Sequence, residues 1–523
     1  MRILANSKIC ISFADLCYGF MFKKVHSCAV LGLNCQGVEV EIDISQGHPE
    51  FNIVGLPDMA VKEAKERIYA AFKNVGFSYP YNKRWTINLA PADIRKEGPS
   101  YDLPMALGII LATADYNFDA EKSLIVGELS LEGKLRHVNG ILPIAIYAKE
   151  KNFKRLYIPS ADAPEASLIK GVEIIPVENL QSLLRHLGGE EIAPFISDHF
   201  AFIPTANYTN DMSHIKGQEN AKRALEIAAA GAHNVLMSGP PGSGKTLLSR
   251  TVPSILPRME EREIIEATKI YSVAGLLPSG KPLITERPFR TPHHTSSGVA
   301  LVGGGKIPKP GEISLAHRGV LFLDEFPEFP RQVLESLRQP LEDGIITVSR
   351  AQGTHTFPAN FILVASQNPC PCGYSGDSER PCSCSPQQVL KYKNKISGPL
   401  LDRIDLHIDV PRVKFSKLSE EHSGESSDII RARVEAARKI QKQRFKDKNL
   451  ITNSEMGPQE VKEFCKIGDD CMNLLKNAVS QLHLSARSYY RILKLSRTIA
   501  DLAGCDNIQE NHIGEALQYR QKE

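Results

Sequence analysis

Residues 239–246, GPPGSGKT, have the residue types and spacing that bind a polyphosphate. Their glycines let consecutive backbone N–H groups turn onto a β-phosphate, and the lysine can reach the β- and γ-oxygens. An apolar strand at 234–237 precedes the loop and TLLSRTV can begin a helix behind it, which favours nucleotide binding over a bare glycine-rich turn. The predicted ATP-binding residues are Gly239, Pro240, Pro241, Gly242, Ser243, Gly244, Lys245 and Thr246. The Thr246 hydroxyl is the predicted Mg²⁺ ligand of this loop.

Two acidic residues, Asp324 and Glu325, end the apolar run GVLFLDE. We expect Asp324 to join the Mg²⁺ shell and Glu325 to polarise the attacking water. Two acids at a strand end often only cap the next element, but together with the phosphate loop they favour hydrolysis over simple binding.

Three further residues are candidates for phosphate sensing. Asn368 ends the apolar run FILVASQNP and could orient the water, although an Asn before a Pro is also a common turn former. Arg403 lies in LLDRID and would stabilise transition-state charge on a neighbouring subunit's γ-phosphate, unless it only pairs with an adjacent aspartate. Arg487 in SARSYYR is the candidate for a phosphate contact from a helical lid, and Arg491 lies one turn further on.

A window of fifteen residues, CPCGYSGDSERPCSC, contains a C-x-C pair at each end. The four cysteines are Cys370, Cys372, Cys382 and Cys384. Four thiolates can close tetrahedrally on Zn²⁺, which leaves no open position for catalysis. The sequence therefore predicts a structural zinc site, with cysteines that serve only as small apolar residues as the alternative.

The elements that must position these residues divide the chain into five segments. From 21 to 187 short apolar strands alternate with helical stretches, which predicts an α/β or α+β domain. Residues 188–211 are rich in Gly, Pro and polar side chains and are interpreted as a linker. Strands and helices alternate again over 212–411, residues 412–523 have a helical period, and 1–20 form an extension of unknown status.

Composition excludes several protein classes. The chain has 523 residues, of which 42% are hydrophobic, so a wholly disordered chain is excluded. No apolar run reaches the ~18 residues of a membrane span. The 63 Lys and Arg nearly balance the 60 Asp and Glu, so any basic surface must be local. Eleven cysteines without a regular framework favour a reducing compartment, and we expect a cytoplasmic protein.

The order of these motifs resembles AAA+ ATPases of the magnesium-chelatase-like branch, and most closely the bacterial ComM/YifB family. Stretches typical of that family include IKGQENAKRALEIAAAGAHN, FRTPHHTSSGVALVGGG and NPCPCGY, and the resemblance extends from Met21 to near the end of the chain. It implies an α/β P-loop core with a helical lid. It also implies a homo-hexameric, ATP-driven motor that acts on DNA, in branch migration or as a helicase, during recombination and natural transformation.

The resemblance assigns a role to each motif. These roles are Walker A at 239–246, Walker B at Asp324 and Glu325, sensor 1 at Asn368, the arginine finger at Arg403 and sensor 2 at Arg487.

The resemblance also implies two hairpins that point into the pore of the ring, at 290–312 and 345–358. Their basic residues include His293, His294, Lys306, Arg350 and His355. Such side chains would contact DNA phosphates without reading sequence, unless the hairpins only pack the ring. The cationic segment 431–449 is a further candidate for nucleic-acid contact, with a solvated lid helix as the equal alternative.

The N-terminal segment resembles the proteolytic domain of Lon proteases, which has an α+β, ribosomal-S5-domain-2-like fold. Ser100 in KEGPSYDLPMALGI is the positional equivalent of the nucleophile, but the position of the catalytic lysine is occupied by Leu142. A serine needs an adjacent base, and Lys134 or Lys149 would require a different geometry. We therefore expect a non-proteolytic domain.

Three other functions remain open from the sequence. A magnesium-chelatase motor subunit is disfavoured because a D-x-S-x-S metal motif is absent. An ATP-dependent protease or chaperone rests on Ser100 alone. A nucleotide-binding scaffold would not need Glu325 and Arg403.

Overall fold

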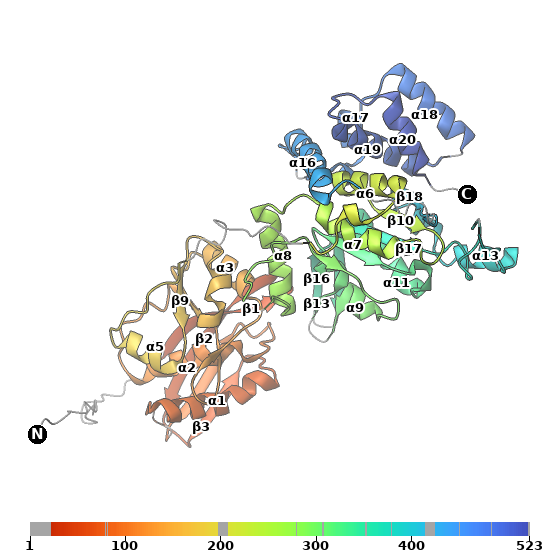
Figure 1. Ribbon diagram of the computed structural model, residues 1–523. Helices are drawn as coiled ribbons and strands as arrows, with labels where there is room; N and C mark the ends of the chain where they lie inside the picture. The colour runs from red at the N-terminus through yellow and green to blue at the C-terminus, as the bar shows by residue number, and fades with distance from the viewer. Residues whose placement is uncertain are drawn as a thin grey trace, which may run out of the picture. The chain divides into compact units, whose positions relative to one another are not determined.

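The computed structural model divides the chain into two compact units, Met1–His199 and Phe200–Glu523 (Figure 1). It describes residues 22–196 and 208–520 except 79, 81, 279, 306, 307, 351, 352, 378, 414–423, 449 and 483. The division falls inside the predicted linker, and the predicted extension 1–20 lies outside the described residues.

The first unit is built on a seven-stranded mixed sheet with the strand order β3-β4-β2-β1-β5-β8-β9. Its strands are β1 Lys23–Leu31, β2 Asn34–Ser45, β3 Glu50–Val54, β4 Arg84–Ala90, β5 Ser123–Ile125, β8 Arg155–Pro159 and β9 Glu173–Val177. A short hairpin consists of β6 Glu128–Leu129 and β7 Leu135–Arg136. Strands β1, β2 and β4 pair antiparallel, and the other neighbours pair parallel.

Both faces of this sheet are covered, because successive side chains of a strand point to opposite faces. In β5, Ile125 joins a core with helices α1 and α2, whereas Leu124 joins a core with α3. The helices are α1 Met59–Val75, α2 Asp102–Thr113, α3 Ile141–Glu150, α4 Ala163–Ala166 and α5 Leu180–Leu187. Helix α1 begins where the Asp58 side chain accepts the Val61 N–H at 2.8 Å, and it ends at Gly76 in a left-handed conformation.

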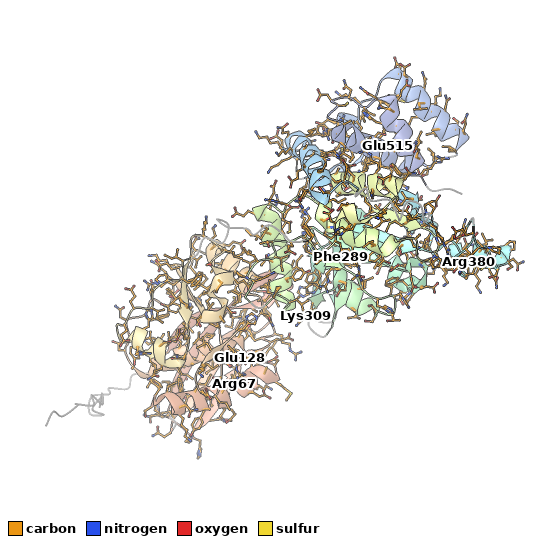
Figure 2. The ribbon with its side chains drawn as sticks, in the orientation of Figure 1. Arg67, Glu128, Phe289, Lys309, Arg380 and Glu515 are labelled. Atoms are coloured by element: carbon orange, nitrogen blue, oxygen red, sulfur yellow. The ribbon has the colours of Figure 1, made fainter. Side chains whose placement is uncertain are left out.

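A buried ion pair joins α1 to α2. The fully buried Asp102 carboxylate accepts two hydrogen bonds from Arg67, which is labelled in Figure 2, at 2.6 Å from Nε and 2.9 Å from Nη2. The backbone N–H of Leu129 donates a third at 3.2 Å. Burial raises the pKa of Asp102, so its charge depends on these donors.

We expect Arg67→Ala to lower the free energy of unfolding of this unit by about 3–5 kcal/mol, because it leaves a buried carboxylate unpaired. The measurement is chemical denaturation followed by fluorescence of Trp85, the single tryptophan, which is buried in this unit. The control is Arg136→Ala, which removes an exposed pair with Glu128 and should cost about 0–1 kcal/mol. Equal destabilisation by the two variants would contradict a dominant role for the buried pair.

The second unit contains a parallel five-stranded sheet with the order β11-β14-β17-β10-β18. Its strands are β10 Val235–Ser238, β11 Phe289–Arg290, β14 Val320–Leu323, β17 Ile362–Gln367 and β18 Leu406–Asp409. The central strands are apolar and buried, as expected for a parallel sheet covered on both faces. Gly239, Asp324 and Asn368 each follow one of these strands, so they lie at one edge of the sheet.

Helices surround this sheet and extend beyond it (Figure 1). They are α6 Glu219–Gly231, α7 Lys245–Ile255, α8 Glu261–Ala274, α9 Gly298–Val302, α10 Glu312–Leu315, α11 Arg331–Glu335, α12 Arg338–Asp343, α13 Pro386–Lys393, α14 Gly398–Leu401, α16 Ser427–Arg444, α17 Pro458–Phe464, α18 Asp469–Gln481, α19 Ala486–Leu502 and α20 Glu510–Gln518. Helix α16 packs on α6 and α7, and α19 packs on α6, α16 and α20. The predicted lid 412–523 thus shares one hydrophobic core with the sheet.

The cationic segment 431–449 begins within α16, and its arginines contact their own unit. Arg433 Nε lies 2.6 Å from Glu226 Oε1, and Arg444 Nη1 lies 2.7 Å from Asp501 Oδ2. These pairs favour the structural alternative, a lid helix, over a nucleic-acid contact.

Candidate nucleotide-binding site

The phosphate loop joins β10 to α7 at the carboxyl edge of the sheet. Gly242 and Gly244 have φ values of 77° and 92°, which side chains disfavour, so the loop requires glycine there. The largely buried Lys245 ammonium donates to the carbonyl oxygens of Gly239 at 2.7 Å and Pro240 at 2.9 Å. Burial lowers the pKa of Lys245. The loop thus holds its cation in its own concavity, as a phosphate site requires.

A pair of oxygen ligands lies beside the loop. Thr246 Oγ1 donates to Asp324 Oδ2 at 3.0 Å. The other carboxylate oxygen accepts the Glu325 backbone N–H at 3.0 Å and the Ser366 hydroxyl. Hydroxyl and carboxylate oxygens fit the preference of Mg²⁺, so Thr246 and Asp324 could hold that ion. Ser366 was not predicted, although it is the first residue of SQNP and follows the apolar part of the strand, a signal that could have found it.

Asn368 reaches the same concavity, where its Oδ1 lies 3.4 Å from Lys245 Nζ. The structure therefore brings together Lys245 and Thr246, the first residues of α7, with Asp324 and Asn368, which follow β14 and β17. Their catalytic roles stay predictions.

Glu325 has φ 52° and ψ 46°, a left-handed conformation that is uncommon for a residue with a side chain. Its half-exposed carboxylate Oε2 lies 3.2 Å from His294 Nδ1. The centre of the His294 ring also lies 4.1 Å from the centre of the His293 ring, and the His294 ring packs edge-on against Phe329. His294 was predicted as a pore residue, and no local pattern indicated that it would contact Glu325.

Arg403 and Arg487 do not join the cluster at the phosphate loop. Both pair with Glu342 of α12: Arg403 Nη2 bonds one carboxylate oxygen, and Arg487 Nη2 lies 2.9 Å from the other. Arg403 thus pairs with Glu342 and not with an adjacent aspartate. Arg491 donates to the backbone carbonyls of Ile404 at 2.7 Å and Asp402 at 3.0 Å, so it supports the Arg403 loop.

The two arginines line a cavity of about 640 Å³ at the opposite edge of the sheet from the phosphate loop. Asn234, Gly319 and Ile362, at the amino ends of β10, β14 and β17, also line it. Its cationic lining residues are Arg287, Arg318, Arg403, Arg438, Arg487, Arg491 and Lys494. Burial lowers the pKa of Arg438 to about 10, and its Nε lacks a hydrogen-bond partner among the described residues. Five acidic residues also line it, and one of them, Glu342, pairs with Arg403 and Arg487; the five are Glu263, Glu342, Asp402, Asp405 and Glu455.

A second cavity of about 630 Å³ borders the phosphate loop. Ile215 and Leu248 give it apolar surface, and His214, Gln218 and Arg412 line it as well. Its position beside the loop suits a nucleoside. These residues were not singled out from the sequence, because each is an ordinary residue of a loop or helix.

The four cysteines of the window cluster in space. Their Sγ atoms all lie within 4.8 Å of one another, and all four are free cysteines. The zinc ion stays a prediction.

The two predicted hairpins differ in structure. Residues Ile345–Arg350 (β15) and Gly353–Pro358 (β16) form an antiparallel pair, whose turn lies outside the described residues together with Lys306 and the Arg350 side chain. Segment 290–312 carries the short helix α9 and, after it, a small antiparallel pair of β12 Gly303–Gly304 with β13 Lys309–Pro310. An ion pair joins the two ends of this segment. Arg290 donates to the Glu312 carboxylate from Nε at 2.6 Å and from Nη2 at 2.7 Å.

In the first unit, Ser100 lies in a short 3₁₀ turn, Pro99–Tyr101, ahead of α2. Leu142 is fully buried in α3. Among the described residues, no basic side chain is hydrogen-bonded to the Ser100 hydroxyl. The absence of proteolytic activity in this unit stays a prediction.

Within the described ranges, no helix combines the length and apolar character needed to cross a bilayer.

Three family models match the chain. "Subunit ChlI of Mg-chelatase" matches residues 40–162, "Magnesium chelatase, subunit ChlI" matches 211–418, and "Magnesium chelatase, subunit ChlI C-terminal" matches 424–520.

Relatives match over nearly the full length. Competence protein ComM of Haemophilus influenzae is 45% identical over 504 residues, which cover 95% of this chain and 97% of that protein. YifB of Escherichia coli is 42% identical over 499 residues, which cover 95% and 96%. The magnesium-chelatase 38 kDa subunit of Rhodobacter capsulatus is 29% identical over 176 residues, only 30% of this chain and 49% of that protein. The chain therefore belongs to the ComM/YifB family of magnesium-chelatase-like AAA+ proteins.

Proposed function

We propose that this protein hydrolyses ATP with Mg²⁺ in a ring of identical subunits, a hexamer by family resemblance, and that the ring moves DNA. The activity would be branch migration or unwinding during recombination and natural transformation, in line with the name of its relative, competence protein ComM. The observation that carries the proposal is the separation of Arg403 and Arg487 from the phosphate loop of their own chain.

That separation matters because hydrolysis needs positively charged groups that contact the γ-phosphate and stabilise its negative charge in the transition state. Strand β10 separates the two edges, and its four residues span about 13 Å. This separation supports a role for Arg403 at the nucleotide of a neighbouring copy. A ring supplies such a neighbour to every site, because its interfaces join opposite faces of adjacent subunits.

The contact between His294 and Glu325 supports coupling between DNA and hydrolysis. Segment 290–312, which carries His294, is clamped at its ends by Arg290 and Glu312. DNA that contacts this segment would displace His294, and the freed Glu325 could then polarise water.

The test is ATP turnover with and without a four-way DNA junction, run beside a branch-migration assay. We expect the junction to stimulate ATP turnover. We also expect ATP-dependent branch migration to convert the junction into separate duplexes. Unchanged turnover together with no DNA binding at low salt, where phosphate contacts are strongest, would refute the action on DNA and leave the ATPase intact.

We expect His294→Ala to raise turnover without DNA several-fold and to reduce the stimulation by DNA. The reason is that a carboxylate engaged in a hydrogen bond is a weaker base than a free one. Phosphate release measured with and without DNA checks this. The control is His293→Ala, which keeps the contact with Glu325. A His294→Ala variant with normal basal turnover and normal stimulation would contradict the coupling.

The family models also favour a second candidate, a motor subunit for metal insertion into a porphyrin. The magnesium-chelatase relatives, however, align with about a third of this chain, whereas ComM and YifB align with 95%. A porphyrin insertion assay with partner subunits would distinguish the two functions.

A further inference from the structure

The sulfur atoms of the cysteine cluster have the spacing of metal ligands. Sγ of Cys370 lies 3.3 Å from that of Cys372 and 3.7 Å from that of Cys382, and the last two are 3.5 Å apart. A tetrahedral Zn²⁺ with Zn–S bonds of ~2.3 Å separates its sulfurs by about 3.8 Å. A disulfide would need about 2.05 Å. The cluster thus matches four ligands around one ion.

The surroundings of the sulfurs favour ligands over apolar packing. Cys370 is buried, but Cys372 and Cys384 are only partly buried and Cys382 is exposed. Small apolar residues would gain little at such positions. The backbone N–H of Cys372 donates to Cys384 Sγ at 3.4 Å, and that of Ser375 donates to Cys370 Sγ at 3.3 Å. Such donors stabilise the negative charge of metal-bound thiolates.

The turn that carries the first two cysteines contacts the phosphate loop. Gly373 has φ 87°, and a Cβ built on it would lie only 2.6 Å from Pro241 Cδ. Its backbone N–H donates to Cys370 O at 3.0 Å, and Asn368 lies two residues before Cys370. A ligand that fixes this turn therefore supports both the loop at Pro241 and the amide at Asn368.

The segment between the two C-x-C pairs reaches the second cavity, which borders the phosphate loop. The guanidinium groups of Arg380 and Arg412 lie 5.4 and 5.6 Å from the centre of the Tyr374 ring, and Figure 2 labels Arg380. Arg412 also contacts Asp377 at 3.3 Å and Glu379 at 3.4 Å. Arg412 and Glu379 line the cavity beside the phosphate loop.

We propose that Cys370, Cys372, Cys382 and Cys384 bind one Zn²⁺, and that this ion holds the turn supporting the phosphate loop, so that metal occupancy sets nucleotide affinity. The metal site stands on the cysteine geometry alone. Its effect on nucleotide affinity rests on the proposed function.

The experiment uses the full chain purified under reducing conditions. We expect about one zinc per chain by elemental analysis, and loss of most of it in Cys372→Ser and Cys382→Ser. The matched control is Cys505→Ser, because Cys505 is a free, partly exposed cysteine outside the cluster. Zinc-free wild-type protein, or full zinc content in Cys372→Ser, would overturn the metal site.

The coupling is tested on the wild-type chain, so a poorly folded variant cannot decide the result. We expect a chelator to weaken binding of a fluorescent ADP analogue by about five- to fiftyfold, a common range for coupled sites, with recovery on added Zn²⁺ but not Mg²⁺. Unchanged affinity after zinc removal would overturn the coupling. A zinc-loaded chain that binds no nucleotide would overturn the coupling and the proposed function while the metal site stands.

Discussion

Glu325→Gln is expected to lower ATP turnover by about 10²–10⁴-fold, the usual contribution of a general base, while nucleotide binding stays near wild type. Glutamine keeps the size of the side chain and can still accept the hydrogen bond from His294. It cannot take a proton from water. Lys245→Ala should lose both turnover and binding, because it removes the cation held in the phosphate loop. Phosphate release and binding of a fluorescent nucleotide measure the two effects separately.

The control for Glu325→Gln is Glu328→Gln. Glu328 lies three residues further on, is partly exposed and pairs with Lys395 at 2.8 Å, away from the phosphate loop. We expect it to keep turnover within about twofold, as surface pairs contribute little. If Glu325→Gln kept wild-type turnover, another base would have to activate the water and the assignment of Glu325 would be wrong.

The carboxyl edge of the ATPase sheet could be predicted from the sequence for a physical reason. Parallel strands end at one edge, so polar residues after consecutive apolar runs must converge there. Lys245, Asp324 and Asn368 follow such runs, and the structure places them together. The cysteines were predictable for a similar reason, since two C-x-C pairs at the ends of one short segment can meet without help from the rest of the fold.

The pairings between distant segments could not be predicted. His294 contacts Glu325, and Arg403 and Arg487 share Glu342, across separations that leave no periodic pattern in the sequence. Such contacts depend on how loops are packed in three dimensions. The same applies to segment 290–312, where the short helix α9 precedes the antiparallel pair of β12 and β13 and was not predicted.

The ion pairs of Glu342 bear on how the arginines act. Hydrogen bonding from Arg403 lowers the pKa of Glu342, so the carboxylate is charged at neutral pH and holds both guanidinium groups at the amino edge of the sheet. This arrangement holds two cations side by side on one carboxylate. A triphosphate from a neighbouring copy would compete with Glu342 for them.

Arg403→Ala is therefore expected to lower turnover by about 10³–10⁵-fold, the range known for arginine fingers. The decisive measurement mixes it with Glu325→Gln. Each variant is inactive by itself, but a site that combines the phosphate loop of the Arg403→Ala copy with the guanidinium of the Glu325→Gln copy has every group intact. With random mixing in equal amounts, about one quarter of the interfaces in a ring are of this kind, so turnover should recover to about that fraction.

The matched control mixes Glu325→Gln with Lys245→Ala. Both substitutions damage the phosphate-loop side of the interface, so no arrangement of copies creates an intact site and no recovery is expected. Recovery in the first mixture and none in the second requires Arg403 to act across subunits, because no single chain in either mixture can hydrolyse ATP. If neither mixture recovers although the variants assemble together, Arg403 acts within its own chain, and its position at the far edge of the sheet would then have to change when nucleotide binds.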